Sequence, residues 1–379
     1  MPTSGFESSN FPEDTKTSPR DWLDKRAAIH GFVATFLLAA MILAGSRGLR
    51  SFDAALVGYT FACLFAMFGV VYRYSVWLSK PPTRMYWRRS LDLFLSPRMW
   101  KGLRAPVLLT GSVWRKLLWQ DFILKRGFWR WAGHMAIAWG CLLASAVTFP
   151  LVFGWLYFES VPEAAETTFR VVVVGHPLMH VKVESLMGWG IFHALVIASF
   201  LVIPGVMIAM YRRMVQESAL AVQTLSRDLL PLVLLFLVSF SGLMLWVSYE
   251  YMGGYFYSVM AQFHALCVIG TLLYMPFGKL FHIFQRPASI GISYYRAAGK
   301  EQGFQACPIT GSEFASTMQV SDLSKVLKEV GFDYERDSLP KQTGISPAWN
   351  HVSPQGRRIL IGRAHSKLLS GSFSKRAND

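Results

Sequence analysis

Charged residues are scarce in this chain. Only 16% of its 379 residues are Asp, Glu, Lys or Arg, whereas soluble domains carry about 25%. The few charges are also segregated, so that long stretches contain almost none. This pattern excludes an ordinary soluble domain and is typical of an integral membrane protein.

Cysteines are few and are not spaced as metal ligands. No two of them form a CxxC pair, which excludes a zinc site or an iron–sulfur ligand set supplied by this chain alone. Nothing in their spacing suggests disulfides. The four cysteines are Cys63, Cys141, Cys267 and Cys307.

Acidic residues are nearly absent from the apolar runs, and the formal net charge is +15. An excess of positive charge can indicate nucleic-acid binding. Here the Lys and Arg residues cluster between the apolar runs, which a positive-inside bias explains better.

Six apolar runs have about the length that crosses a bilayer. They predict an all-α membrane protein with six transmembrane helices. The first run lacks a small-residue cleavage site, so we expect a retained anchor and not a signal peptide. The runs are about Ala28–Ala44, Ala54–Leu78, Trp131–Leu156, Leu186–Tyr211, Leu229–Val247 and Tyr257–Phe284.

The connecting segments predict the orientation. The segment from Lys80 to Arg130 contains twelve Lys or Arg residues, and the tail after Phe284 is also basic. We therefore expect both termini in the cytoplasm, although Arg47 and Arg50 then fall outside.

Three regions follow from this layout. Residues 1–27 form a cytoplasmic N-terminal segment, and residues 28–287 form a transmembrane domain. Within it, the basic and aromatic loop 79–130 predicts amphipathic helices in the membrane interface, or a docking surface for a cytoplasmic partner. The cytoplasmic tail 288–379, with one short helix expected at 320–332, is predicted to dock on a partner.

Histidines in the last apolar run carry the functional hypothesis. A histidine inside a span is costly unless it has a partner. His264 and His282 lie 18 residues apart, which on one continuous helix places both on one face, about 27 Å apart along the axis. This spacing suits two b haems near opposite faces of the bilayer.

Each haem needs a second axial ligand at a matching depth. His134 is the candidate to face His282 at the inner haem, with His30 as its competitor. His193, about 10 Å into the fourth run by helix rise, is the candidate to face His264 at the outer haem. The alternatives at the outer site are His176 and His180, if their loop re-enters the membrane.

The segment from Phe263 to Pro287 resembles the last helix of the gamma (cytochrome b) subunit of respiratory nitrate reductases. The likeness rests on the two spaced histidines, on Met275-Pro276-Phe277 and on the closing element from His282 to Pro287. The motif RWAGH, which contains His134, and the motif HVKVESLMGWG also resemble that family. Membrane subunits of heterodisulfide-reductase type share the same plan.

The resemblance implies a quinol-linked electron-transfer subunit in a bacterial or archaeal inner membrane. Lys182 matches a lysine near the family's quinol site. Electrons would pass through two b haems to a cytoplasmic iron–sulfur subunit and a catalytic subunit, for which a molybdopterin enzyme is one candidate. Residues 28–287 would then form a cytochrome b domain with a haem-binding bundle of four to five helices. The family has a second ligand ten residues after the first, where this chain has Ala144. Either His193 replaces that ligand or the outer haem is missing, and the matching depth of His193 favours replacement.

Two other functions remain open at this point. One is a six-span secondary transporter in which histidines relay protons, and the other is a haem-free anchor for a soluble enzyme. The near absence of acids from the apolar runs and the lack of a sequence repeat argue against the transporter. Neither the terminal substrate nor the direction of electron flow follows from the sequence.

Overall fold

A computed structural model describes the chain except for residues 1–23, 98–103, 162–166, 216–223, 333–350 and 377–379. The predicted segment 1–27 therefore lies almost wholly outside the described residues. The chain forms two compact units, each built from two stretches of sequence. Unit 1 comprises Met1–Val76 and Gly133–Phe281, and unit 2 comprises Trp77–Ala132 and His282–Asp379.

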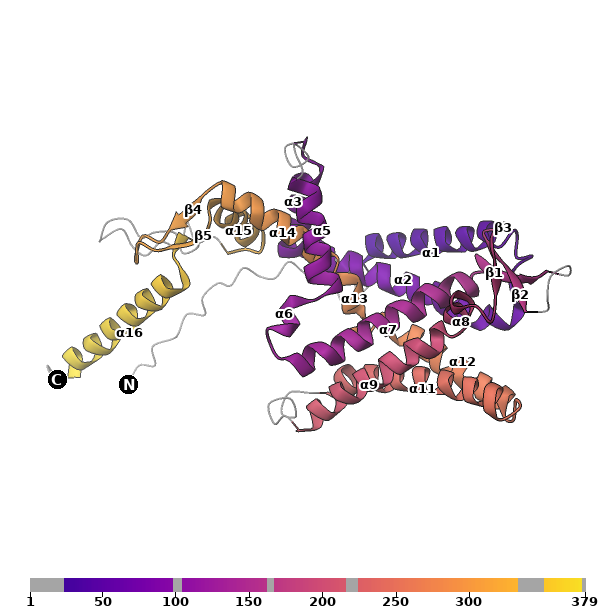
Figure 1. Ribbon diagram of the computed structural model, residues 1–379. Coiled ribbons are helices and arrows are strands. Elements are labelled where there is room, and N and C mark those ends of the chain that lie inside the picture. Colours follow the sequence, from indigo (N-terminus) through magenta and orange to yellow (C-terminus); the bar gives the residue numbers. More distant parts are fainter. Residues whose placement is uncertain (1–23, 98–103, 162–166, 216–223, 333–350, 377–379) are drawn as a thin grey trace. The chain divides into compact units, whose positions relative to one another are not determined.

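The described part of the chain contains six helices that are long and apolar enough to cross a membrane, as predicted (Figure 1). The chain is therefore a multi-pass membrane protein by the length and composition of its helices. The six are α1 (Lys25–Gly45), η1 with α2 (Ala54–Leu56 and Val57–Ser79), α7 (Phe128–Val152), α9 (Ala194–Val215), η3 with α11 (Leu225–Leu229 and Leu230–Tyr251) and α12 (Tyr257–Tyr274).

The last apolar run is not one continuous helix, and that prediction is wrong beyond Tyr274. After α12 the chain turns through Met275–Gly278 and continues as η4 (Lys279–Phe281) and α13 (His282–Gln285). Pro276 has no N–H for a helical hydrogen bond, and its ring clashes with the preceding turn. The shared helical face and the 27 Å separation of His264 and His282 therefore no longer follow from helix geometry.

The fourth apolar run is also interrupted. The short helix α8 (Leu186–Phe192) ends at His193, whose φ of −100° and ψ of 6° are not helical, and α9 begins at the next residue. His193 thus lies at the start of the long helix. Helix rise counted from Leu186 no longer gives its depth.

Small residues bring two of the long helices close together in unit 1. A Cβ on Gly140 of α7 would come 2.9 Å from the Ala198 carbonyl oxygen of α9, and one on Gly205 of α9 would come 2.8 Å from the Gly133 carbonyl oxygen of α7. Within lipid the hydrophobic effect does not drive helices together, so the van der Waals contacts of such a close approach stabilise the helix pair instead. A buried cluster of Val202, Val206 and Leu232 extends this packing to α11.

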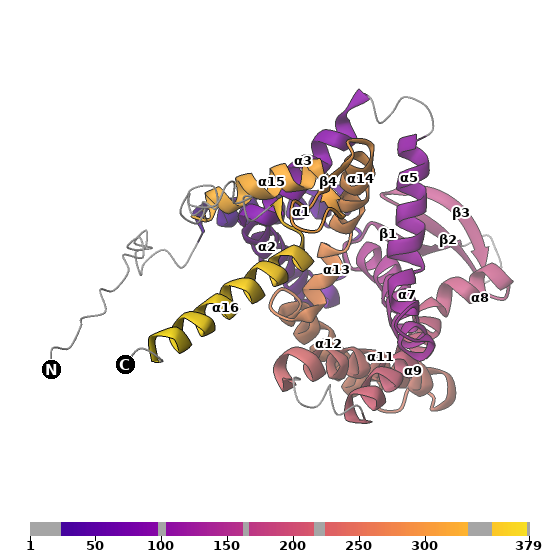
Figure 2. The ribbon, with the colours of Figure 1, turned by 90° about the vertical axis from the view of Figure 1, so that its left-hand side faces the viewer.

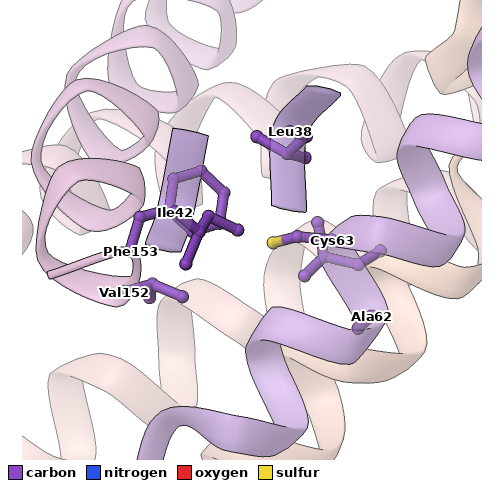
Figure 3. Close-up of a cluster of buried hydrophobic side chains, with 7 residues drawn as sticks. Leu38, Ile42, Ala62, Cys63, Val152 and Phe153 are labelled. Atoms are coloured by element: carbon purple, nitrogen blue, oxygen red, sulfur yellow. The ribbon is translucent and has the colours of Figure 1, made fainter. Parts of the chain in front are cut away.

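A second buried cluster joins α1, α2, α12 and the end of α7 (Figure 3). The side chains of Leu38 and Ile42 on α1 meet Cys63 on α2 and Phe153 after α7. The indole N–H of Trp155 donates to the Met41 carbonyl at 3.1 Å. The first span is thus held by side-chain packing and by a hydrogen bond to its backbone.

An antiparallel sheet between α7 and α8 adds β structure that was not expected. Its strands are β1 (Leu156–Ser160), β2 (Thr168–Val173) and β3 (His176–Lys182), in the order β1-β2-β3. Its two outer strands have unpaired backbone edges, which do not occur in contact with hydrocarbon. We therefore place the sheet outside the hydrocarbon layer.

Unit 2 combines the loop after the second span with the tail. The tail helices α14 (Ala288–Glu301) and α15 (Thr317–Glu329) pack on α3 (Pro81–Leu95), and α14 also packs on α5 (Arg104–Val113) (Figure 2). The short helix expected at 320–332 corresponds to α15. The remaining elements are η2 (Trp114–Leu118), α6 (Asp121–Leu124), β4 (Phe304–Ala306), β5 (Glu313–Ser316) and α16 (Pro354–Arg376).

A buried polar network joins the tail to the loop within unit 2. The Arg89 guanidinium donates to both carboxylate oxygens of Asp322, and the Tyr295 hydroxyl donates to the same carboxylate at 3.1 Å. Asp322 is 2% exposed. The tail thus contacts its own chain, while its docking on a partner stays a prediction.

Candidate haem-ligand site

His264 is seated between α12 and α11. Its Nδ1 atom lies 2.9 Å from the Ser241 hydroxyl, and that hydroxyl donates its single proton to the Leu237 carbonyl at 2.6 Å. The short bond to the Leu237 carbonyl uses the hydroxyl's proton, which favours the tautomer in which Nδ1 donates to the hydroxyl and Nε2 keeps its lone pair. This is the tautomer that binds iron through Nε2.

Gly242, next to Ser241, makes room for the same ring. A Cβ at Gly242 would come 3.2 Å from Cε1 of His264. Sequence reasoning missed both residues. A Ser-Gly pair inside an otherwise apolar span was the signal that could have found them.

His193 is held in the same tautomer by a different partner. Its Nδ1 lies 2.9 Å from the Trp189 carbonyl oxygen, and its ring stacks on the Trp189 indole with centroids 4.9 Å apart. A carbonyl oxygen can only accept a hydrogen bond, so Nδ1 is protonated and Nε2 is available as a ligand.

The donor chemistry of His264 and His193 therefore fits haem iron, which takes neutral imidazole nitrogens whose other nitrogen is hydrogen-bonded. The glycines near them also differ in what surrounds them. Cβ atoms at Gly190 and Gly270 would meet nothing within 4 Å, so helix packing does not require a glycine at either position. Gly188 instead lies against the Lys182 carbonyl and is a packing residue.

The four predicted ligands are not all brought together by observed contacts. His134 lies on α7 in unit 1 and His282 begins α13 in unit 2. In the described part of unit 1, no hydrogen bond or ring contact joins His193 to His264. Both pairings stay predictions.

The alternative histidines have different surroundings. His30 is exposed on α1, with Nδ1 3.1 Å from the Ser75 hydroxyl of α2. His176 and His180 lie on strand β3 and not on a re-entrant loop, and Arg170 of β2 donates to Nε2 of His180 at 3.4 Å. A sheet strand outside the hydrocarbon is a poor source of an intramembrane ligand, which favours His193 over either of them.

Lys182, the quinol-site candidate, ends β3 with its side chain exposed. Its carbonyl accepts from the Ser185 hydroxyl at 2.7 Å, and that hydroxyl accepts from the Gly188 N–H at the start of α8. This tight turn, together with the packing of α8 on β3, links Lys182 to the short helix that ends at His193. Lys182 and His193 thus lie at the two ends of one strand–turn–helix segment.

The interruption of the last span is itself a polar site that sequence reasoning missed. Arg73 of α2 donates to the carbonyls of Pro276 and Gly278, and its guanidinium lies 4.4 Å from the ring centroid of Phe281. On the other side, Asp228 pairs with Arg213 at 3.3 Å and with Lys279. The Arg73 guanidinium thus satisfies carbonyls of the unwound backbone that lipid could not satisfy.

Within the described ranges, no three His, Cys, Asp or Glu side chains gather as a self-contained metal centre. The four cysteines are all free thiols. Both observations leave the haem hypothesis untouched, because haem iron takes only two axial ligands from the protein.

Comparison of the chain with protein-family models, with curated proteins and with solved structures finds no match. The class of protein that the fold defines is thus a multi-pass helical membrane protein. The resemblance to nitrate reductase gamma subunits stays a prediction.

Proposed function

We propose that the chain is a dihaem b membrane subunit that transfers electrons between membrane quinol or quinone and a cytoplasmic oxidoreductase partner. The observation that carries this proposal is the hydrogen bonding around His264. Ser241, which donates to the Leu237 carbonyl, favours the tautomer whose Nε2 is unprotonated and can bind iron. His193, fixed by the Trp189 carbonyl, supports it independently.

His264 and His193 would hold the outer haem, and His134 and His282 the inner one. A bound haem b supplies a one-electron couple at each position. The Ser241 hydroxyl and the Trp189 carbonyl would hold the imidazoles of His264 and His193 in the tautomer whose Nε2 carries no proton. They would also fix the orientation of both rings. Lys182, exposed beside α8, would donate a hydrogen bond to a quinone oxygen.

The partner side of the proposal rests on the sequence resemblance. A cytoplasmic iron–sulfur subunit would exchange electrons with the inner haem, and a catalytic subunit, for which a molybdopterin enzyme is one candidate, would carry out the terminal reaction. The membrane would be the inner membrane of a bacterium or archaeon.

A reduced-minus-oxidised spectrum of the purified chain, produced in a haem-replete host, tests the proposal. We expect a b-type α band with about two haems per chain. The His264→Ala variant should lose one haem and keep the other. His176→Ala, which removes an exposed histidine from β3, is the matched control and should keep both. A wild-type chain without haem would refute the proposal.

The interrupted last span favours a second candidate, a six-span secondary transporter with a histidine proton relay, because discontinuous helices line substrate sites in transporters. Arg73 already binds the carbonyls of Pro276 and Gly278, so these oxygens are not available to a substrate or ion. Histidine-dependent proton uptake by a haem-free chain in proteoliposomes would support the transporter. A haem-free chain without such uptake would support a simple anchor.

A further inference from the structure

The segment Trp114–Trp131 of unit 2, here called the aromatic elbow, joins η2, α6 and the first turn of α7. Two left-handed residues turn its backbone, Gln120 at φ 56° and Gly127 at φ 134°. The Trp131 indole N–H donates to the Trp119 carbonyl at 2.7 Å, and the two indole rings lie 4.9 Å apart. The elbow is therefore a defined structure and not a loose connection.

Large apolar side chains of the elbow are exposed. Trp129 and Phe128 are 69% and 59% exposed, although both lie in the first turn of a helix long and apolar enough to span the membrane. Grouped exposed aromatics mark an interaction surface. The other exposed members are Trp114, Trp119 and Leu124.

Two cations of the elbow have no acidic partner among the described residues. Lys125 and Arg126 are exposed, and neither pairs with a carboxylate in the part of the chain that the structure describes. The only acid of the elbow, Asp121, is neutralised by Arg115 at 2.8 Å. The surface that remains is positive and aromatic.

A third cation, Arg286, lies in the turn directly after α13. The Arg286 guanidinium lies 4.5 Å from the ring centroid of Phe122 in the elbow. Burial lowers the pKa of Arg286, and the positive charge of Arg126 lowers it further. Two guanidinium groups that repel each other favour an anion bound near both.

We propose that the aromatic elbow is a binding site for anionic phospholipid, with the headgroup phosphate held by Lys125, Arg126 and Arg286. A lipid fits better than a soluble partner because the elbow continues directly into a membrane-spanning helix, whose first turn must lie at the membrane surface. Trp side chains prefer this interfacial depth. Basic residues there select anionic headgroups. The proposal is independent of haem binding.

Native mass spectrometry of the delipidated full-length chain, with phosphatidylglycerol or phosphatidylcholine added, tests this site. We expect phosphatidylglycerol to bind more tightly, and the double variant Lys125→Gln/Arg126→Gln to weaken its binding about tenfold. The matched control Lys300→Gln/Lys325→Gln removes the same charge from exposed positions on α14 and α15 and should bind like the wild type.

A second measurement guards against misfolded variants. In wild-type chain in phosphatidylglycerol nanodiscs, a water-soluble amine reagent should label Lys125 less than in detergent, while labelling of Lys300 stays the same. Equal binding of the two lipids, equal loss in the control variant, or full labelling of Lys125 in nanodiscs would overturn the proposal. Full labelling would mean that the elbow faces water and is open to a soluble protein.

Discussion

Gly69 on α2 lies directly against Pro276 in the interruption of the last span. A Cβ at Gly69 would come 2.7 Å from both Cβ and Cγ of the proline, which is almost fully buried. The interruption is therefore a packed feature of unit 1, with a partner helix shaped to receive it.

Gly69→Ala should destabilise unit 1, because the added methyl group forces α2 away from Pro276. Overpacking of this kind costs about 1–3 kcal/mol, and thermal unfolding in detergent would measure it. Gly111→Ala on α5 is the control, since a Cβ there meets nothing within 4 Å. An unchanged melting temperature for Gly69→Ala would show that the contact is looser than described.

Arg73→Met should destabilise unit 1 more than Arg73→Lys. Methionine leaves the carbonyls of Pro276 and Gly278 without their donor, at a cost of about 1–3 kcal/mol for each group. Lysine keeps the charge but not the planar donor geometry. Thermal unfolding would rank the two variants. Arg88→Met, at an exposed position on α3, should be neutral, and equal effects of all three substitutions would contradict the assigned role.

Ser241→Ala tests how the His264 tautomer is fixed. Loss of a hydrogen-bond partner behind a ligating histidine weakens metal binding by about 10–100-fold, so the outer haem should be lost more readily during purification. The measurements are the haem content of the purified chain and the midpoint potential of the outer haem that stays bound. Ser239→Ala, on the same helix, is the control. If haem content and potential match the wild type, Ser241 does not position the ligand.

Asp322→Ala should loosen the tail from α3 within unit 2. The substitution removes the carboxylate that accepts from Arg89 and Tyr295. Because the Arg89 side chain is partly exposed and stays solvated, we expect a cost of about 1.5–3 kcal/mol, the range for hydrogen bonds to a charged group. Limited proteolysis should then cut the tail faster. Glu313→Gln on β5, an exposed position, serves as control, and an unchanged rate of cleavage in Asp322→Ala would contradict the network.

Unit 2 should also weaken at alkaline pH. Burial, and then the charge of Asp322, raise the pKa of Tyr295. Because the fold favours the neutral phenol, its stabilisation is complete below about pH 10 and is lost as pH rises toward the higher folded pKa. Proteolysis between pH 9 and pH 11 should show this loss, and Tyr295→Phe should flatten it. Tyr86→Phe, beside the same ring, is the comparison.

Most of the helical layout could be predicted from the sequence, because length and apolar content alone set the spans. The end of the last span could not be predicted in this way. The residues around Pro276 stay apolar, so hydropathy continues through the turn while the proline ends the helix. The missing N–H of Pro276 was the local signal, and the fit against Gly69 is visible only in three dimensions.

The candidate site could be predicted only in part. Histidines stand out in an apolar run because they are polar, so His264 was found. Ser241 was missed because a serine can satisfy its own hydroxyl on the preceding turn and is common in spans. Only the structure shows that its remaining lone pair faces the imidazole. Similarly, the contact between Asp322 and Arg89 joins residues far apart in sequence.

Unit 2 is split along the chain, and this has a consequence for biosynthesis. The ribosome finishes α3 and α5 before four of the six long helices, yet their partners α14 and α15 emerge only after all of these. The apolar and charged face of α3 that packs on α14 and α15 therefore stays uncovered while those four helices are inserted into the membrane. The tail can dock on α3 only after the last membrane-spanning helix has been made. In an unfinished chain, this face of α3 would stay accessible to proteases.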